Sequence, residues 1–144
     1  MRPRSPAIAS AAGPRAWLRR LAVPLLAGAA ATAMASSAPP DAVTRCGWFD
    51  NPTPGNATLT DRDGEWTIGL QGGHQAKGDW PKFKPGQWVR TGTGSAGYGC
   101  ACLKVKADAA SQEVSVIVSS RTQALGVCRK DKALHGLEPQ NPLK

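Results

Sequence analysis

Four cysteines are the residues of this 144-residue chain whose type and spacing most clearly predict chemistry: Cys46, Cys100, Cys102 and Cys128. They can pair into two disulfides in three ways. Pairing Cys100 with Cys102 is the poorest, because alternate residues of a strand stand roughly 6.6 Å apart, whereas the Cβ atoms of a disulfide lie about 3.5–4.5 Å apart. We therefore expect each of these two cysteines to bind one of the outer two. Both crossed pairings stay open.

Two other uses of the cysteines are less favourable. A C-x-C pair is tighter than the C-x₂₋₄-C spacing usual for zinc ligands, so we expect no metal site and no cofactor. Thiol–disulfide exchange at Cys100 and Cys102 needs a reactive thiol of low pKa. Four cysteines that can pair fully argue against such a thiol, so we predict two structural disulfides.

The N-terminal segment is typical of a secretory signal peptide. Residues 1–20 contain five arginines and no acid, residues 21–33 are an apolar run, and Ala33-Met34-Ala35 offers a cleavage site. We expect residues 1–35 to be removed, leaving an exported protein, periplasmic or extracellular. The apolar run is shorter than the roughly 20 residues that a membrane-spanning helix needs, so no stable span is expected after cleavage.

Removal of the signal peptide changes the meaning of the chain's charge. The whole chain has a net charge of +8, but five of its arginines lie before residue 36, which leaves 13 basic against 10 acidic residues, or +3. This charge is mild and evenly spread, whereas a nucleic-acid-binding protein has a clustered basic face. Nucleic acid is therefore not an expected partner.

The remaining chain predicts one small, mainly β domain: an antiparallel sheet or sandwich with long turn-rich loops, stapled by two disulfides. We expect a flexible leader over 36–45, the β domain over 46–135 and a frayed tail over 136–144. Asp63-Gly64 predicts a hairpin turn within 59–70, and 130–134 favours a single helical turn. Further strands are expected at 87–91, 100–106 and 113–119, the last with Val114, Val116 and Val118 inward.

The strand that contains the central cysteines has two distinct faces. Ala101, Leu103 and Val105 share one face, and Cys100 and Cys102 share the other with lysines. Before it, residues 92–97 spell G-x-G-x-x-G, but the run leads from strand to strand. Since no helix N-terminus follows to hold a pyrophosphate, we expect a hairpin loop that binds no nucleotide.

The expected ligand site lies near the N-terminal end of this strand. Residues 46–56 contain prolines, asparagines and glycines and predict an irregular loop. Whichever crossed pairing occurs, the disulfides hold this loop beside the strand and gather Trp48, Asp50, Asn51 and Tyr98. An aromatic face with polar neighbours favours a sugar or a protein partner. Trp80 also lies in a polar loop, whereas Trp66 and Trp88 are assigned to the core.

Three classes of function remain open. The favoured one is a non-catalytic binding module for a protein or glycan of the cell envelope. The second is a structural envelope protein without a discrete site. The third, an enzyme, is the least expected, since His74, Asp50, Asp61 and Asp79 supply acid–base groups without a recognisable catalytic spacing.

Several linked motifs resemble a known family. They are Cys46-Gly47-Trp48-Phe49, Asn51-Pro52-Thr53-Pro54-Gly55-Asn56, Asp61-Arg62-Asp63-Gly64-Glu65-Trp66, Gln71-Gly72-Gly73 and Gly97-Tyr98-Gly99-Cys100-Ala101-Cys102-Leu103. Together they resemble the domain-of-unknown-function 4087 family of small exported bacterial proteins. The resemblance implies a compact secreted domain, and it transfers no catalytic residue.

Overall fold

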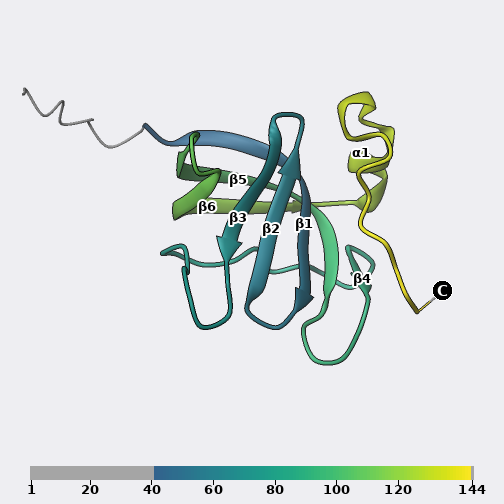
Figure 1. The fold of residues 1–144 in the computed structure, drawn as a ribbon. Coiled ribbons are helices and arrows are strands. Elements are labelled where there is room, and N and C mark those ends of the chain that lie inside the picture. Colours follow the sequence, from purple (N-terminus) through teal and green to yellow (C-terminus); the bar gives the residue numbers. More distant parts are fainter. Residues whose placement is uncertain (1–40, 144) are drawn as a thin grey trace, which may run out of the picture. The chain divides into compact units, whose positions relative to one another are not determined.

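A computed structural model describes residues 41–143, which form a mainly β unit with a short helical segment at its C-terminal end (Figure 1). The expected signal peptide and most of the expected leader lie outside the described residues. The strands are β1 (Val43–Thr53), β2 (Asn56–Asp61), β3 (Gly64–Gly69), β4 (Trp88–Arg90), β5 (Gly97–Asp108) and β6 (Glu113–Gln123). They are followed by the helix α1 (Leu125–Lys130) and the 3₁₀ turn η1 (Lys132–Leu134).

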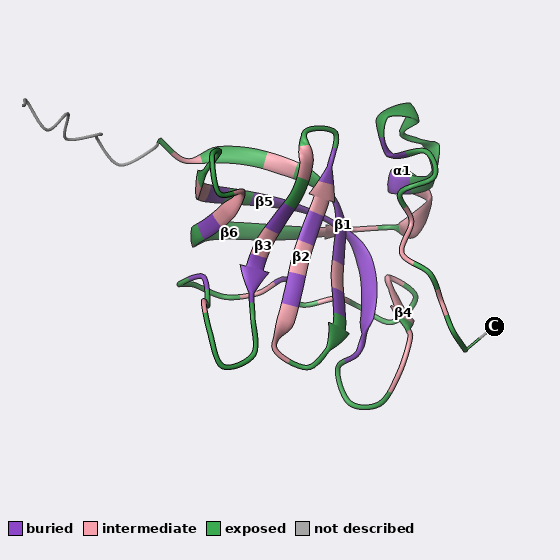
Figure 2. Cartoon of the chain, in the orientation of Figure 1, coloured by how far each residue is buried: buried purple, intermediate pink, exposed green. Residues whose placement is uncertain are grey.

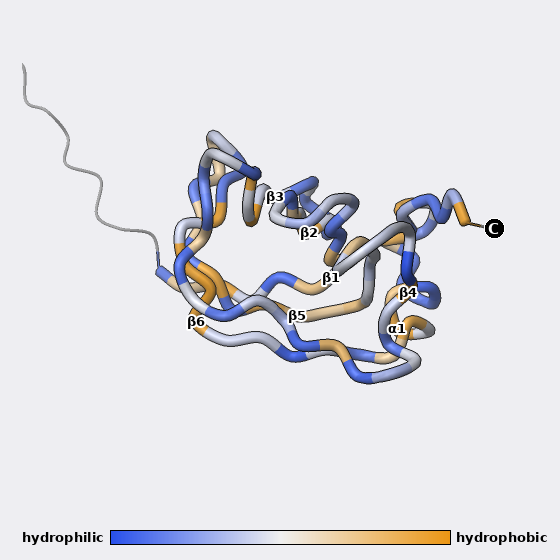
Figure 3. The backbone as a smooth tube through the Cα atoms, turned by 90° about the horizontal axis from the view of Figure 1, so that it is seen from below, coloured by the Kyte–Doolittle hydropathy of each residue, from blue (hydrophilic) through white to orange (hydrophobic). Residues whose placement is uncertain are grey.

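The six strands form one sheet in the order β1-β2-β3-β6-β5-β4, and β1 also pairs with β5. Five strands therefore close into a ring, and β4 pairs with the first three residues of β5. The pairings are antiparallel except β3–β6, which is parallel at Thr67 and Glu113. In Figure 1 the β2–β3 hairpin crosses the direction of β5 and β6, and in Figure 3 β5 lies between β1 and β6. The mainly β fold is confirmed, as a mixed rather than purely antiparallel sheet.

β1 corrects the expected irregular loop over 46–56. This strand starts at Val43, inside the expected leader, and is paired with β5 on one side and with β2 on the other. Its one asparagine and one proline, Asn51 and Pro52, lie near its end, where the β1–β2 register shifts between Asp50 and Thr53. Pairing on both sides stabilises the extended backbone there, so neighbouring strands override the local turn preference.

The β2–β3 hairpin is present, but its turn lies one residue earlier than expected. Asp61 pairs with Gly64, so Arg62 and Asp63 are the turn residues. The Asp61 side chain explains the difference, since its Oδ1 accepts hydrogen bonds from the backbone N–H of Asp63 (2.8 Å) and from Trp66 Nε1 (3.1 Å). An aspartate that bonds two residues ahead fixes such a turn.

β5 has the two faces that its sequence predicts, and β6 differs in part. Figure 2 shows β5 buried along its first half, and Ala101, Leu103 and Val105 belong to the main core. On β6, Val114 is buried as expected, but Ile117 replaces Val116 as the next core residue and Val118 is 51 % exposed. Two register shifts in the β5–β6 ladder cause this change of face.

The two disulfides are Cys46–Cys102 and Cys100–Cys128, which selects one of the two crossed pairings, and no cysteine is free. Cys46 and Cys102 are direct register partners of β1 and β5. Cys128 lies on α1, a six-residue helix that the sequence interpretation missed; it had placed a single turn only at 130–134. The second disulfide thus attaches the helical segment to β5.

Candidate functional site

The four residues expected to bind a ligand do not form one exposed site. Trp48 and Tyr98 are 0 % and 3 % exposed, and their rings meet edge to face with centroids 5.7 Å apart. They pack with both cysteines of the second disulfide and with Leu134 in a small core of their own. Because β1 is a strand and not a loop, alternate residues face opposite sides. Trp48 therefore presents no aromatic face to a ligand.

Asp50 and Asn51 also have separate surroundings. Asp50 is half-buried, which raises the pKa of its carboxyl group, although a hydrogen bond from the backbone N–H of Asn51 opposes the shift. Asn51 is 3 % exposed and shares the face of Phe49. Its Nδ2 donates to the backbone oxygen and to the Oγ of Ser95, both at 3.1 Å. Of the four residues, Asn51 is the one that lines the largest hollow described below.

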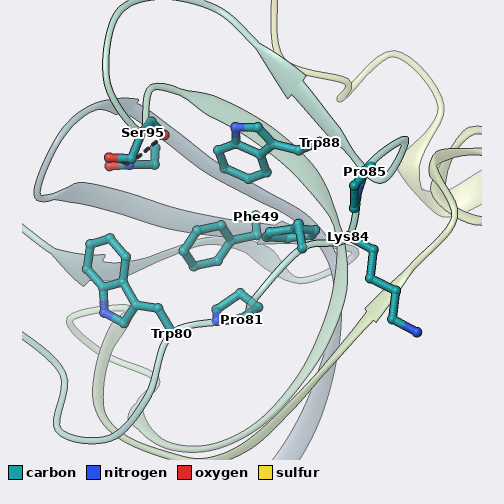
Figure 4. Close-up of a pocket in the computed structure, with 9 residues that line it drawn as sticks. Phe49, Trp80, Pro81, Lys84, Pro85, Trp88 and Ser95 are labelled. Carbon is teal, nitrogen blue, oxygen red and sulfur yellow. Dashed lines mark hydrogen bonds between the residues drawn. The ribbon is translucent and has the colours of Figure 1, made fainter.

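That hollow is a cleft of about 450 Å³ between β1, β4 and the connection from β3 to β4, which we call the aromatic cleft. Figure 4 shows Trp80 and Trp88 on either side of Phe49, with Lys84 pointing away from the rings. Phe49 is buried, whereas Trp80 and Trp88 are partly exposed. The full lining is Phe49, Asn51, Trp80, Pro81, Phe83, Lys84, Pro85, Trp88 and Ser95.

The rings of the aromatic cleft hold one another in tilted and edge-on arrangements. Phe83 and Trp88 are closest, with centroids 4.7 Å apart, and Phe49 lies 5.7 Å from Trp80 and 5.9 Å from Phe83. Such pairs are each worth about 0.5–1.5 kcal/mol beyond their area burial. A glycine makes this packing possible, because a Cβ on Gly99 of β5 would collide with the Phe83 ring and the Gln87 carbonyl.

The sequence interpretation found this cleft only in part. It named Trp80 as a second candidate for binding, placed Trp88 in the core, and passed over Phe83. The available signal is the alternation of aromatic residues and prolines over residues 80–88. Prolines fix the backbone of a loop and cannot join a ladder, so a loop of this composition favours side chains held at a surface.

Two of the four acid–base candidates, His74 and Asp61, are engaged in contacts elsewhere in the fold. The two ring nitrogens of His74 contact Glu113 Oε1 and the Val114 carbonyl oxygen, each at 2.7 Å, so this histidine ties the β3–β4 connection to β6. Asp61 binds Arg45 at 2.8 Å, and the Arg45 guanidinium lies over the Trp66 ring at 3.5 Å. Within residues 41–143, no carboxylate or histidine lines the aromatic cleft. Its lining is mainly aromatic and apolar, and Lys84 is its single charged side chain.

Comparison with known proteins gives one match. A family model described as "Protein of unknown function (DUF4087)" matches residues 41–135, which contain all six strands and both helical elements. Neither the curated proteins nor the solved structures give a match. No helix among the described residues is long and apolar enough to cross a membrane.

Proposed function

The chain belongs to the DUF4087 family, whose function is unknown, so we propose a function from the side chains of this protein. It is a non-catalytic domain that binds a protein partner through the aromatic cleft. The observation that carries this proposal is that Trp80, Phe83 and Trp88 are only partly buried around a hollow of about 450 Å³. Ligand sites are commonly concave, mostly apolar and supplied with a few polar groups.

The lining favours an apolar side chain of a peptide over a sugar ring. A sugar needs several hydrogen-bonding groups for its hydroxyls. Here Asn51 Nδ2 already donates to Ser95 Oγ, and Asn51 Oδ1, which has no partner among the described residues, is buried and offers a single acceptor. The prolines at positions 81 and 85 add apolar surface, and Lys84 lies at the rim. A leucine or aromatic side chain of a partner fits this chemistry better than a polyol does.

The two disulfides support a compartment for this binding. Both bridges persist in an oxidising environment, as in secreted and periplasmic proteins. Together with the signal peptide expected over residues 1–35, this supports an exported domain that meets its partner in the cell envelope or outside the cell.

The test is selection from a display library of random twelve-residue peptides on the disulfide-bonded protein. We expect enriched peptides with apolar residues, and Trp80→Ala should weaken their binding at least tenfold. Trp48→Phe is the matched control, because it changes a tryptophan that lies outside the cleft. Unchanged binding by Trp80→Ala, or a collapse of its melting temperature, would show that Trp80 serves packing instead.

A further inference from the structure

We propose that the partner is an extended, acidic peptide segment that adds as a strand to the open edge of β6 beside the aromatic cleft. This inference rests on the proposed function, since it gives the class of partner whose apolar side chain enters the cleft. It depends on three features of the described residues: an unpaired strand edge, a hollow beside that edge, and the charges that line the hollow.

The first feature is the edge of β6 that faces away from β5. The other neighbours of β6 pair near its start: β3 at Glu113 and the isolated bridge from Lys77 to Val116. Lys77 donates its N–H to the Ser115 carbonyl and accepts from Ile117 N, at 3.0 and 2.7 Å. Among residues 41–143, no strand or bridge pairs with this edge over 118–123. Alternate residues of that stretch therefore direct backbone groups toward solvent.

The local chain explains why this pairing stops. Gly78 has a φ of +101°, and a Cβ there would collide with the Ile117 carbonyl. The chain therefore passes very close to β6 at this glycine and then leaves it. Beyond it, four residues of 79–84 line a hollow together with residues 120–122 of β6 and form no bridge with them. A short segment of this protein thus already occupies the start of the edge in the way we propose for the partner.

The second feature is a hollow of about 410 Å³ between this edge and residues 79–84, which we call the basic slot. It shares Trp80 and Lys84 with the aromatic cleft, so the two hollows adjoin. Its full lining is Asp79, Trp80, Lys82, Lys84, Ser120, Arg121 and Thr122. An extended chain in the slot reaches the cleft without leaving the surface.

The third feature is the charge of the basic slot. Lys82, Lys84 and Arg121 carry three positive charges against the single carboxylate of Asp79. Within residues 41–143, none of these three cations has a carboxylate within ion-pair distance. The slot therefore complements acidic side chains, while main-chain hydrogen bonds to β6 supply affinity that does not depend on sequence. Exposed edges often carry charges only to prevent sheet-to-sheet association; the experiment separates these two roles.

The experiment uses the peptides enriched on the wild-type, disulfide-bonded protein. We expect acidic residues at alternate positions, and at least tenfold slower amide exchange at alternate residues of 118–123 when peptide is bound. Arg121→Glu should weaken binding at least tenfold. Lys132→Glu, an equal charge change at a residue of η1 that does not line the slot, should leave binding unchanged. Methylation of alternate peptide nitrogens should abolish binding, because it removes main-chain donors while keeping the side chains.

The other results decide the inference and the proposed function separately. Peptides that lose affinity with Trp80→Ala but not with Arg121→Glu or methylation would confirm the cleft and refute strand addition. Tighter binding of an acidic oligosaccharide, oligogalacturonate, at the slot would assign it to a glycan. If no peptide is enriched, both proposals are wrong. Loss with Arg121→Glu and methylation but not with Trp80→Ala would support the edge and refute the cleft.

Discussion

The interaction between Tyr98 and Glu138 shows how single residues hold the C-terminal segment in place. Tyr98 donates its hydroxyl to Glu138 Oε1 at 2.9 Å, and Arg129 donates from Nε and Nη2 to the same carboxylate at 3.0 and 2.7 Å. Burial of Tyr98 raises the pKa of its hydroxyl, and the hydrogen bond and charge of Glu138 raise it further. Glu138 lies in the segment that the sequence predicts to be frayed, yet it is bound from two sides.

This contact predicts the alkaline titration of Tyr98, which is the only tyrosine of the chain. Tyrosinate absorbance should rise with a midpoint above the unperturbed value of about 10, and the midpoint should return to that value in denaturant. The folded state holds the proton more tightly, so its contribution to stability is present below the unfolded pKa. That contribution is lost as the pH rises through the folded pKa.

Two variants control this measurement. Glu138→Gln removes the negative charge and should lower the folded midpoint. Lys104→Glu places a new carboxylate at an exposed position of β5, six residues and roughly 20 Å along the strand from Tyr98, and should not move it. An unshifted midpoint in the wild-type protein would mean that the tail does not hold Tyr98 in solution.

At the scale of the elements, local pattern predicts β5 well and β1 poorly. The alternation from Ala101 to Val105 is short-range information, and the structure confirms both the strand and its two faces. β1 contains Asn51 and Pro52, whose local preference is for turns, and it is extended because β2 and β5 pair with it. Whether Val116 or Ile117 is buried in the core depends on the register shifts between β5 and β6. The residue pattern of β6 alone does not show these shifts.

The candidate site is likewise predictable only where it depends on local sequence pattern. The sequence predicts that aromatic and polar side chains gather near the N-terminal end of β5, and Asn51 does line a hollow there. Its partners could not be identified from spacing, because strand alternation sends Trp48 to one side of β1 and Phe49 to the other. Trp80, Phe83 and Trp88 join Phe49 only through the path of the long connection between β3 and β4.

The disulfide between Cys100 and Cys128 makes a prediction about α1. This helix has six residues and no side-chain cap at its N-terminus, so it is too short to be stable alone. Replacing both cysteines by alanine should speed the amide exchange of α1 and η1 toward unfolded rates and lower the tyrosinate midpoint of Tyr98. The free energy of unfolding should fall by about 2–4 kcal/mol.

Removal of Cys46 and Cys102 is the matched control for that experiment. These residues are already register partners in the β1–β5 ladder, so the strands stay adjacent through their hydrogen bonds. We expect a loss of stability of similar size, but with α1 still protected. If α1 exchanges equally in both variants, the helical segment is held by its packing on Trp48 and Tyr98 and not by its disulfide.

At the largest scale, the described residues combine a ring of five strands with two covalent links that join β1 and α1 to β5. The ring pairs most of its strands on both sides, and the stretch of β6 over 118–123 is one of several edges among the described residues that stay open. A domain of about 100 residues has a modest core. The two disulfides therefore supply a substantial share of the stability that remains after the entropy cost of folding.

The dependence on disulfides gives the last prediction, which concerns where the protein matures. Full-length chain produced in a bacterial host should be recovered from the envelope or the medium. Its mass should correspond to residues 36–144 with two disulfides, and it should take up no alkylating reagent until it is reduced. When residues 36–144 are expressed without the signal peptide, the protein stays in the reducing cytoplasm. It should then carry four reactive thiols and have a lower melting temperature.

Uncleaved chain in the cytoplasm that is already fully oxidised would contradict the export route. Alkylation of the exported form would contradict the pairing of all four cysteines.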